Sequence, residues 1–95
     1  MHGEYKVPGG KLVVVDLEVR DGRLAGVRVS GDFFLEPDTA LAWINQALEA
    51  MPANAGEAAY TTAIAGALEG AQAYGLSAEG VAIAVGRALQ AQVDV

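Results

Sequence analysis

The sequence predicts an α+β fold, in which a three-stranded antiparallel meander is followed by about three helices packed on it. Residues 4–35 alternate between apolar and polar side chains, which is the period of a half-buried strand. At Glu36-Pro37-Asp38 the period changes to the three- and four-residue spacing of amphipathic helices. The 95 residues contain no internal repeat and no low-complexity linker. We therefore expect one domain over residues 1–95, with a modest core.

Two turn signals separate the predicted strands. A short strand from Glu4 to Val7 ends at Pro8-Gly9-Gly10, and proline followed by glycine suits the two central positions of a tight turn. The second strand covers Leu12 to Arg20. Asp21-Gly22 is a strong hairpin signal, because both central residues of a type I′ turn need positive φ. A third alternating run then continues to the end of the strand region at about residue 35.

The helical part is expected over about residues 37–93. Glu36-Pro37-Asp38 suits a first helical turn, because proline fits there and acidic side chains favour the positive end of the helix dipole. Pro52 is expected to end this helix. Ser77 is a good N-cap for the last helix, with Leu76 and Val81 placed as a hydrophobic staple.

A middle helix is expected over about residues 56–73. Its apolar face carries Tyr60, Ile64 and Leu68. Gly66 and Gly70 each cost roughly 1 kcal/mol of helix propensity. We expect close packing against another backbone to compensate for these two glycines.

Composition limits the classes of function. The chain has no cysteine, which excludes disulfides, thiol catalysis and iron–sulfur ligation. Residues 1–35 carry balanced charges, so the net charge of −6 comes from residues 36–95, and such an acidic half argues against nucleic acid or anionic membranes as partners. No apolar run approaches the roughly 18 residues of a membrane span. No signal peptide is found, and we expect a cytoplasmic protein.

No group of residues suits catalysis by this chain alone. His2 is the only histidine and is expected to be a solvated residue in a frayed terminus. The carboxylates are scattered along the strands and do not suggest a metal site. Ser30 and Ser77 have no histidine partner, and neither common glycine-rich nucleotide motif occurs. We expect no catalytic residue, no metal site and no cofactor bound by the chain alone.

The first candidate binding feature is the turn that Lys6 and Lys11 flank. If Pro8-Gly9 is a two-residue loop, Lys6 lies directly opposite Lys11, and such a like-charge pair suggests an anion between the two. If Gly10 forms a bulge in a three-residue loop, Val7 faces Lys11 and the conflict disappears. A solvated turn with two exposed lysines is the third alternative, and spacing alone does not decide among them.

The second candidate feature is Gly31-Asp32-Phe33-Phe34 at the end of the third strand. Consecutive strand residues point to opposite faces. We therefore expect either Phe33 or Phe34, but not both, to be largely exposed in the free chain and covered in a complex. Gly31 indicates a bulge or a close backbone approach. Core packing and an interface role both remain open for these two rings.

The stretch from His2 to about Pro52 resembles the C-terminal accessory domain of lipoate–protein ligases. The resemblance depends on Lys-Val-Pro-Gly-Gly-Lys-Leu at residues 6–12, the following hairpin, and Gly-Asp-Phe-Phe-Leu-Glu-Pro at residues 31–37. The helices that follow fit that domain in length and order. The resemblance implies a SufE/NifU-like α+β fold.

The resemblance also implies a function. Such ligases use ATP, with magnesium, to activate lipoate to lipoyl-AMP, and then pass the lipoyl group to a lysine of a lipoyl domain. The accessory domain supports activation and in some members is a separate polypeptide. The present chain lacks the catalytic domain, with its glycine-rich loop and its catalytic lysine. The resemblance therefore implies a non-catalytic subunit that works with a separate catalytic ligase subunit and, indirectly, with lipoyl-domain acceptor proteins.

The residues that match the accessory-domain motifs are expected to lie near the partner or the nucleotide. They are Lys6, Pro8, Gly9, Gly10, Lys11, Gly31, Asp32, Phe33 and Phe34. Two alternatives from other classes are a stand-alone protein-binding scaffold and a sensor of a lipoate-type acid without ligase activity.

Overall fold

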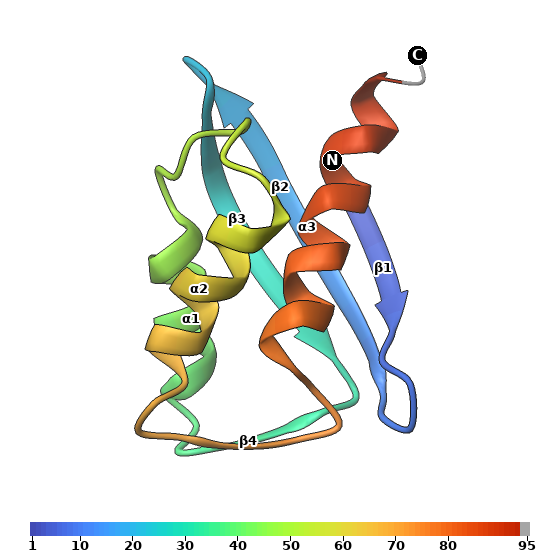
Figure 1. Cartoon of the computed structure of the whole chain (residues 1–95), viewed down its shortest axis with the longest axis vertical. Helices are drawn as coiled ribbons and strands as arrows, with labels where there is room; N and C mark the ends of the chain where they lie inside the picture. The colour runs from blue at the N-terminus through green and yellow to red at the C-terminus, as the bar shows by residue number, and fades with distance from the viewer. Residues whose placement is uncertain (94–95) are drawn as a thin grey trace.

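The computed structural model describes residues 1–93 and confirms the α+β fold (Figure 1). Three strands form an antiparallel sheet in the order β1-β2-β3: β1 (His2–Lys6), β2 (Leu12–Arg20) and β3 (Arg23–Gly31). Two short strands form a separate two-stranded ribbon: β4 (Phe34–Glu36) and β5 (Gln72–Tyr74). The helices are α1 (Ala40–Leu48), α2 (Glu57–Ala67) and α3 (Ala78–Val93).

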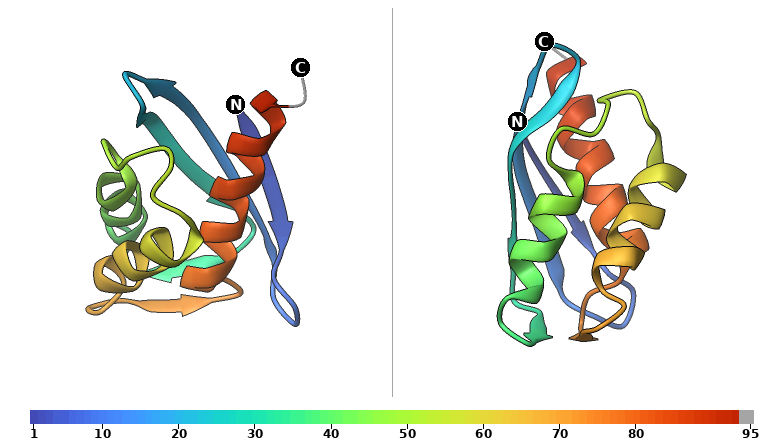
Figure 2. Two further views of the ribbon diagram at one scale, coloured as in Figure 1. Left: turned by 45° about the horizontal axis from the view of Figure 1, so that its top comes forward. Right: turned by 90° about the vertical axis from the view of Figure 1, so that its left-hand side faces the viewer.

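The three helices cover one face of the sheet, and no described element covers the other face (Figure 2). The covered face contributes Val13, Val15, Leu24 and Val29 to a core that the helices complete with buried Ile44, Leu48, Ile64, Val81 and Val85. Helix α3 lies close against β1. A Cβ atom at Gly3 would overlap the backbone of Ala84 and Ala88, so glycine is required at this contact.

The predicted hairpin between β2 and β3 is confirmed. Asp21 and Gly22 both have positive φ, 53° and 75°, and Arg20 pairs with Arg23 across the two-residue loop. Glycine and aspartate tolerate this conformation better than most residues, which is why the pair directs the turn.

Helix α1 and the segment after it close the outer edge of β3. The Asn45 side chain accepts the backbone N–H of Val29 at 3.0 Å. The Glu49 carboxylate accepts the N–H groups of Val27 and Gly26 at 3.0 and 2.9 Å. These two hydrogen bonds hold the pKa of Glu49 below its usual range, and the bond from Val27 has the larger effect. Edge N–H groups that would otherwise invite another strand are thereby satisfied.

Helix α1 is shorter at both ends than the sequence predicts. It begins at Ala40, and no acidic residue lies in its first turn, so Pro37 and Asp38 belong to the preceding turn. It ends at Leu48, before Pro52, because the next residues bond to the sheet. The N–H of Ala50 donates to the carbonyl of Leu24 at 2.8 Å, which removes residue 50 from the helical ladder.

Helix α2 also ends earlier than expected, at Ala67, and residues 72–74 form β5. Gly66 and Gly70 face open space, since a Cβ atom at either would meet nothing within 4 Å. The prediction that a close backbone contact compensates for these glycines is therefore wrong. Their low helix propensity favours the end of the helix, and pairing with β4 supplies backbone hydrogen bonds to the residues that follow.

Helix α3 begins as predicted. The Ser77 hydroxyl accepts the backbone N–H of Gly80 at 3.0 Å, and Leu76 and Val81 are both buried beside this cap. No helix among residues 1–93 is both long and apolar enough to cross a membrane.

Candidate functional site

Both sequence motifs lie at one end of the molecule, which we call the ribbon end. It comprises the β1–β2 turn with the residue on either side (residues 6–12), the segment from Gly31 to Phe34, the β4–β5 ribbon and Gly75. These parts lie together at the bottom of Figure 1. Two contacts join them: Gly31 pairs with Val13 at the start of β2, and the N–H of Lys11 donates to the carbonyl of Gly75 at 2.9 Å.

The β1–β2 turn has a three-residue loop. The N–H of Val7 donates to the carbonyl of Lys11 at 3.1 Å, and Lys6 pairs with Leu12. Of the two registers that the sequence allows, the one with Val7 facing Lys11 is confirmed, and the one with Lys6 opposite Lys11 is wrong. No like-charge pair therefore requires an anion. Both lysines are exposed, and among residues 1–93 neither has a carboxylate within 4.0 Å.

Glycines fix the shape of this turn and its contact with the segment after β5. Gly9 has a φ of 72°, and the N–H of Gly10 donates to the carbonyl of Val7 at 2.8 Å. A Cβ atom at Gly10 would lie 3.0 Å from the carbonyl oxygen of Gly75. Gly75 has a φ of 81°, and its Cβ atom would lie 2.6 Å from Cγ of Lys11. Pro8 is exposed. Because residues 10 and 75 carry no side chain, the Lys11 backbone can approach residue 75 closely enough for its N–H to bond to the Gly75 carbonyl.

Phe33 and Phe34 differ in exposure, as expected. Phe33 packs against the core, whereas Phe34 is 55% exposed. Phe34 pairs across the ribbon with Tyr74, which is 54% exposed, and their ring centroids are 6.1 Å apart. Leu35, the next residue of β4, points to the opposite face and is buried. The ribbon therefore presents an aromatic pair to solvent.

A shallow pocket of about 300 Å³ lies beside this pair. Its apolar lining comes from Phe33, Phe34, Leu35 and Leu41, and its polar lining includes Ser30 and Asp38. Gly31 also lines it, with a φ of 150°, and a side chain there would overlap the carbonyl oxygen of Leu12. Asp32 is exposed beside Gly31. The chain can leave β3 and enter the ribbon here because residue 31 is a glycine.

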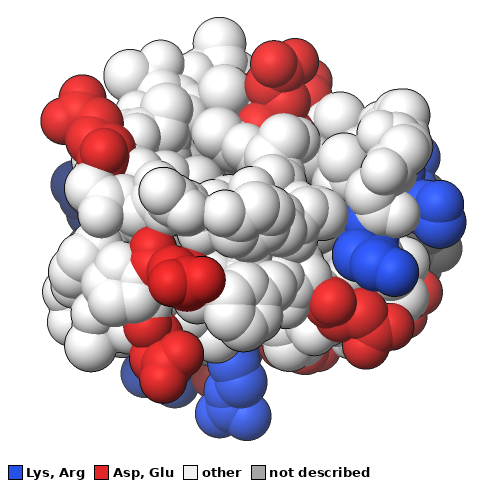
Figure 3. All heavy atoms as spheres, turned by 90° about the horizontal axis from the view of Figure 1, so that it is seen from below, with Lys and Arg blue, Asp and Glu red and all other residues white. Residues whose placement is uncertain are grey.

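Charges of both signs surround the uncharged middle of the ribbon end (Figure 3). The two lysines belong to the β1–β2 turn and the residue next to it. Glu36 ends strand β4 of the ribbon, and Asp32 and Asp38 belong to the segments before and after that strand. This arrangement suits contact with a second macromolecule better than enclosure of a small substrate.

Three residues of this end and of the pocket beside it were not expected from the sequence: Leu41, Tyr74 and Gly75. Tyr74-Gly75 falls where the alanine-rich stretch predicts the end of a helix, so its pairing with β4 was hidden. The available signal was an aromatic residue directly before a glycine and a Ser77 cap, which is a loop pattern rather than a helical one.

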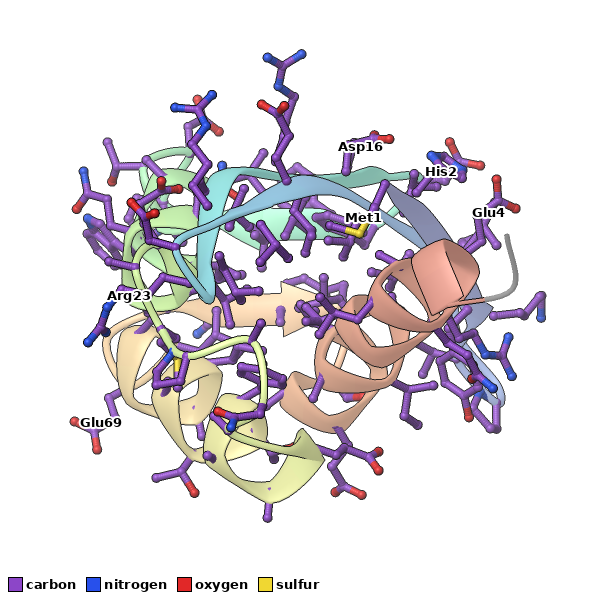
Figure 4. All side chains as sticks on the ribbon, turned by 90° about the horizontal axis from the view of Figure 1, so that it is seen from above. Met1, His2, Glu4, Asp16, Arg23 and Glu69 are labelled. Carbon is purple, nitrogen blue, oxygen red and sulfur yellow. The ribbon has the colours of Figure 1, made fainter. Side chains whose placement is uncertain are left out.

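The prediction of a frayed terminus at His2 is wrong. His2 lies in β1 opposite Asp16, and its two ring nitrogens lie 2.7 Å from Asp16 Oδ1 and 2.7 Å from Glu4 Oε2 (Figure 4). Hydrogen bonds to Glu4, which has the larger effect, and to Asp16 raise the pKa of His2 above its ordinary value of 6.5. The side chain is exposed, as expected. This cluster lies at the other end of β1 from Lys6, so it is separate from the ribbon end.

Comparison with known proteins supports the fold. No protein-family model matches the chain, and no curated protein matches it at a significant level. Among solved structures, the chain is similar to the small subunit of a bi-partite lipoate protein ligase from Thermoplasma acidophilum, an archaeal lipoylation system described with its E2 lipoyl domain. The TM-score is 0.74 at 20% identity, over 90% of this chain and 92% of that chain. The two chains therefore share a fold along nearly their whole length, and the SufE/NifU-like label stays a prediction.

Proposed function

We propose that this chain is the non-catalytic accessory subunit of a two-chain lipoate–protein ligase. The observation that carries the proposal is the fold shared with the small subunit of a bi-partite ligase over 90% of the chain. The position of the motif residues adds support, because the residues that match the accessory domain in sequence gather at one exposed end.

In this proposal, lipoate, ATP and magnesium bind to the catalytic subunit, and the accessory subunit supports the activation of lipoate to lipoyl-AMP. What this chain contributes is positive charge and a close backbone approach. The ammonium groups of Lys6 and Lys11 are exposed and unpaired among the described residues, so they are free to bind phosphate or carboxylate oxygens. The glycine turn between them lets a partner approach the main chain.

Reconstitution tests this function. The purified chain, a catalytic ligase subunit from the same organism, and an equimolar mixture of the two are each incubated with lipoate and ATP. We expect lipoyl-AMP from the mixture, little from the catalytic subunit and none from this chain. Lipoyl-AMP formation by this chain alone, after contaminating ligase is excluded, would contradict an accessory role, as would a mixture no faster than the catalytic subunit.

A further inference from the structure

The ribbon end exposes most of the large apolar side chains that the core leaves out. Among residues 1–90, whose side-chain exposure the structure describes, only four large hydrophobic side chains are exposed, and three of them, Leu12, Phe34 and Tyr74, lie at this end. Scattered exposed apolar residues are normal, but a group of them marks an interaction surface. The fourth, Trp43, lies on helix α1.

The β4–β5 ribbon is packed on one face and exposed on the other. Its strands have three residues each and pair only with one another, and two-stranded ribbons are marginally stable in water by themselves. Its inner face is covered, because Leu35 is buried in the core. Its outer face holds Phe34 and Tyr74, both more than half exposed, beside the pocket that Phe33 and Leu41 line. A second layer over these rings would bury them as Leu35 is buried on the inner face.

The charges around the rings indicate what that second layer is. Both lysines of the chain, Lys6 and Lys11, lie at the β1–β2 turn, and neither has an acidic partner among the described residues. Glu36 is the last residue of β4 and Asp38 follows the ribbon, and they too have no cation within 4.0 Å in the described part of the chain. The complementary surface is apolar in its centre, with carboxylates opposite the lysines and basic groups opposite the two acids.

We infer that the outer face of the ribbon is the docking surface for the catalytic subunit. Phe34 and Tyr74 are its anchors, and Lys6 and Lys11 contact carboxylates of the catalytic subunit. The inference rests on the proposed function for the identity of the partner. A second copy of this chain is disfavoured because each copy carries a net charge of −6, which repels the other. An anionic membrane is disfavoured for the same reason.

Binding measurements with the catalytic subunit test the inference. The variant Phe34→Ser/Tyr74→Ser removes both rings, and Trp43→Ser removes an exposed ring outside the ribbon. We expect the double variant to raise Kd by about thirty-fold or more, as loss of interface anchors does, and Trp43→Ser to change it by about threefold at most. Circular dichroism checks folding, and if the double variant unfolds, the single variant Phe34→Gln replaces it. High concentrations of the ring variant should restore lipoyl-AMP formation, because only affinity is lost.

The outcomes separate this inference from the proposed function. If the wild-type chain neither binds the catalytic subunit nor supports activation, the proposed function is wrong. If the wild-type chain does both and the ring variant binds equally well, the function stands and the docking surface lies elsewhere. Sedimentation of the free chain provides a further check. A dimer that the ring variant abolishes would make this face a contact between copies and overturn the inference.

Discussion

The two ends of this molecule differ in how far they bury a tyrosine side chain. Tyr60 lies near the end formed by the Asp21-Gly22 turn and residues 49–55, which we call the turn end. It is only 2% exposed, and its hydroxyl donates to the carbonyl of Pro52 at 2.7 Å. Tyr74 at the ribbon end is 54% exposed, and its hydroxyl donates to the side chain of Gln72, two residues away.

The backbone follows the same division. At the turn end, N–H groups of Leu24, Ala50 and Ala53 all donate across to other segments at 2.8 Å, and Arg23 donates to the carbonyl of Ala50. At the ribbon end, a single backbone bond from Lys11 to Gly75 joins the β1–β2 turn to the segment after β5. The turn end is therefore joined to the rest of the fold by more bonds, whereas the ribbon end leaves apolar and charged groups exposed.

The largest expected effect is the difference in stability loss between a tyrosine variant at the turn end and one at the ribbon end. Replacing Tyr60 by alanine removes a buried ring and leaves the Pro52 carbonyl without its donor, so we expect a loss of about 3–5 kcal/mol in the free energy of unfolding. Replacing Tyr74 by alanine should cost about 0.5–1 kcal/mol, since only an exposed ring pair is lost. Urea unfolding measures both. Equal losses for the two variants would show that the ribbon end is as important for stability as the turn end.

A smaller effect is expected where helix α1 closes the edge of β3. Replacing Asn45 by alanine leaves the N–H of Val29 without its acceptor, and we expect a loss of about 1–3 kcal/mol. The matched control is Gln46→Ala on the same helix, because Gln46 is exposed and makes no such bond. A loss for Gln46→Ala as large as that for Asn45→Ala would assign the effect to helix propensity instead.

Sequence patterns predicted those parts of the fold whose signals are local. The alternation of β2, the Asp21-Gly22 turn and the Ser77 cap each depend on neighbouring residues, and all three are confirmed. The same holds for the different exposure of Phe33 and Phe34. The sequence also placed the two motifs that form the ribbon end, although it did not bring them together.

The features that the sequence did not predict depend on distant partners. A three-residue strand such as β5 has too few residues to show a period, and its partner β4 lies about 40 residues earlier. Helix α1 ends early because residues 49–51 bond to β3, and no pattern within the helix contains that information. His2 is held by Asp16 on the next strand, so its position near the terminus was misleading.

The smallest expected effect concerns His2 and pH. Glu4 and Asp16 bond to its ring. Arg28 of β3 lies opposite Asp16 in the strand register. The pKa of His2 is raised in the folded chain. Its contribution to stability is therefore fully present below about pH 6.5 and is lost as pH rises through the raised pKa. The effect should be small because the group is exposed.

Urea midpoints of wild type and His2→Gln, measured from pH 5 to pH 9, check this expectation. We expect the wild type to be the more stable at low pH and the difference to close as pH rises. A difference that stays constant across this range would show that the ring contributes contacts rather than charge.

The most direct test of the central claim, that the ribbon end supports activation in a two-chain ligase, is a split assay on Lys6→Ala/Lys11→Ala. The first assay measures lipoyl-AMP formation by the reconstituted pair, and the second measures lipoyl transfer from pre-made lipoyl-AMP. The control Arg20→Ala/Arg28→Ala removes the same charge from the sheet away from the ribbon end. All the variants should remain folded, because exposed charges contribute little to stability.

With saturating accessory subunit, we predict that the lysine variant slows activation by about tenfold or more, the effect of losing one charge-assisted hydrogen bond of about 1.5 kcal/mol. Transfer should be unchanged, and the arginine control should match wild type in both assays. Equal activation rates for the lysine variant and wild type would contradict a role of the two lysines in activation and leave Lys6 and Lys11 as docking contacts or as solvated residues of a turn.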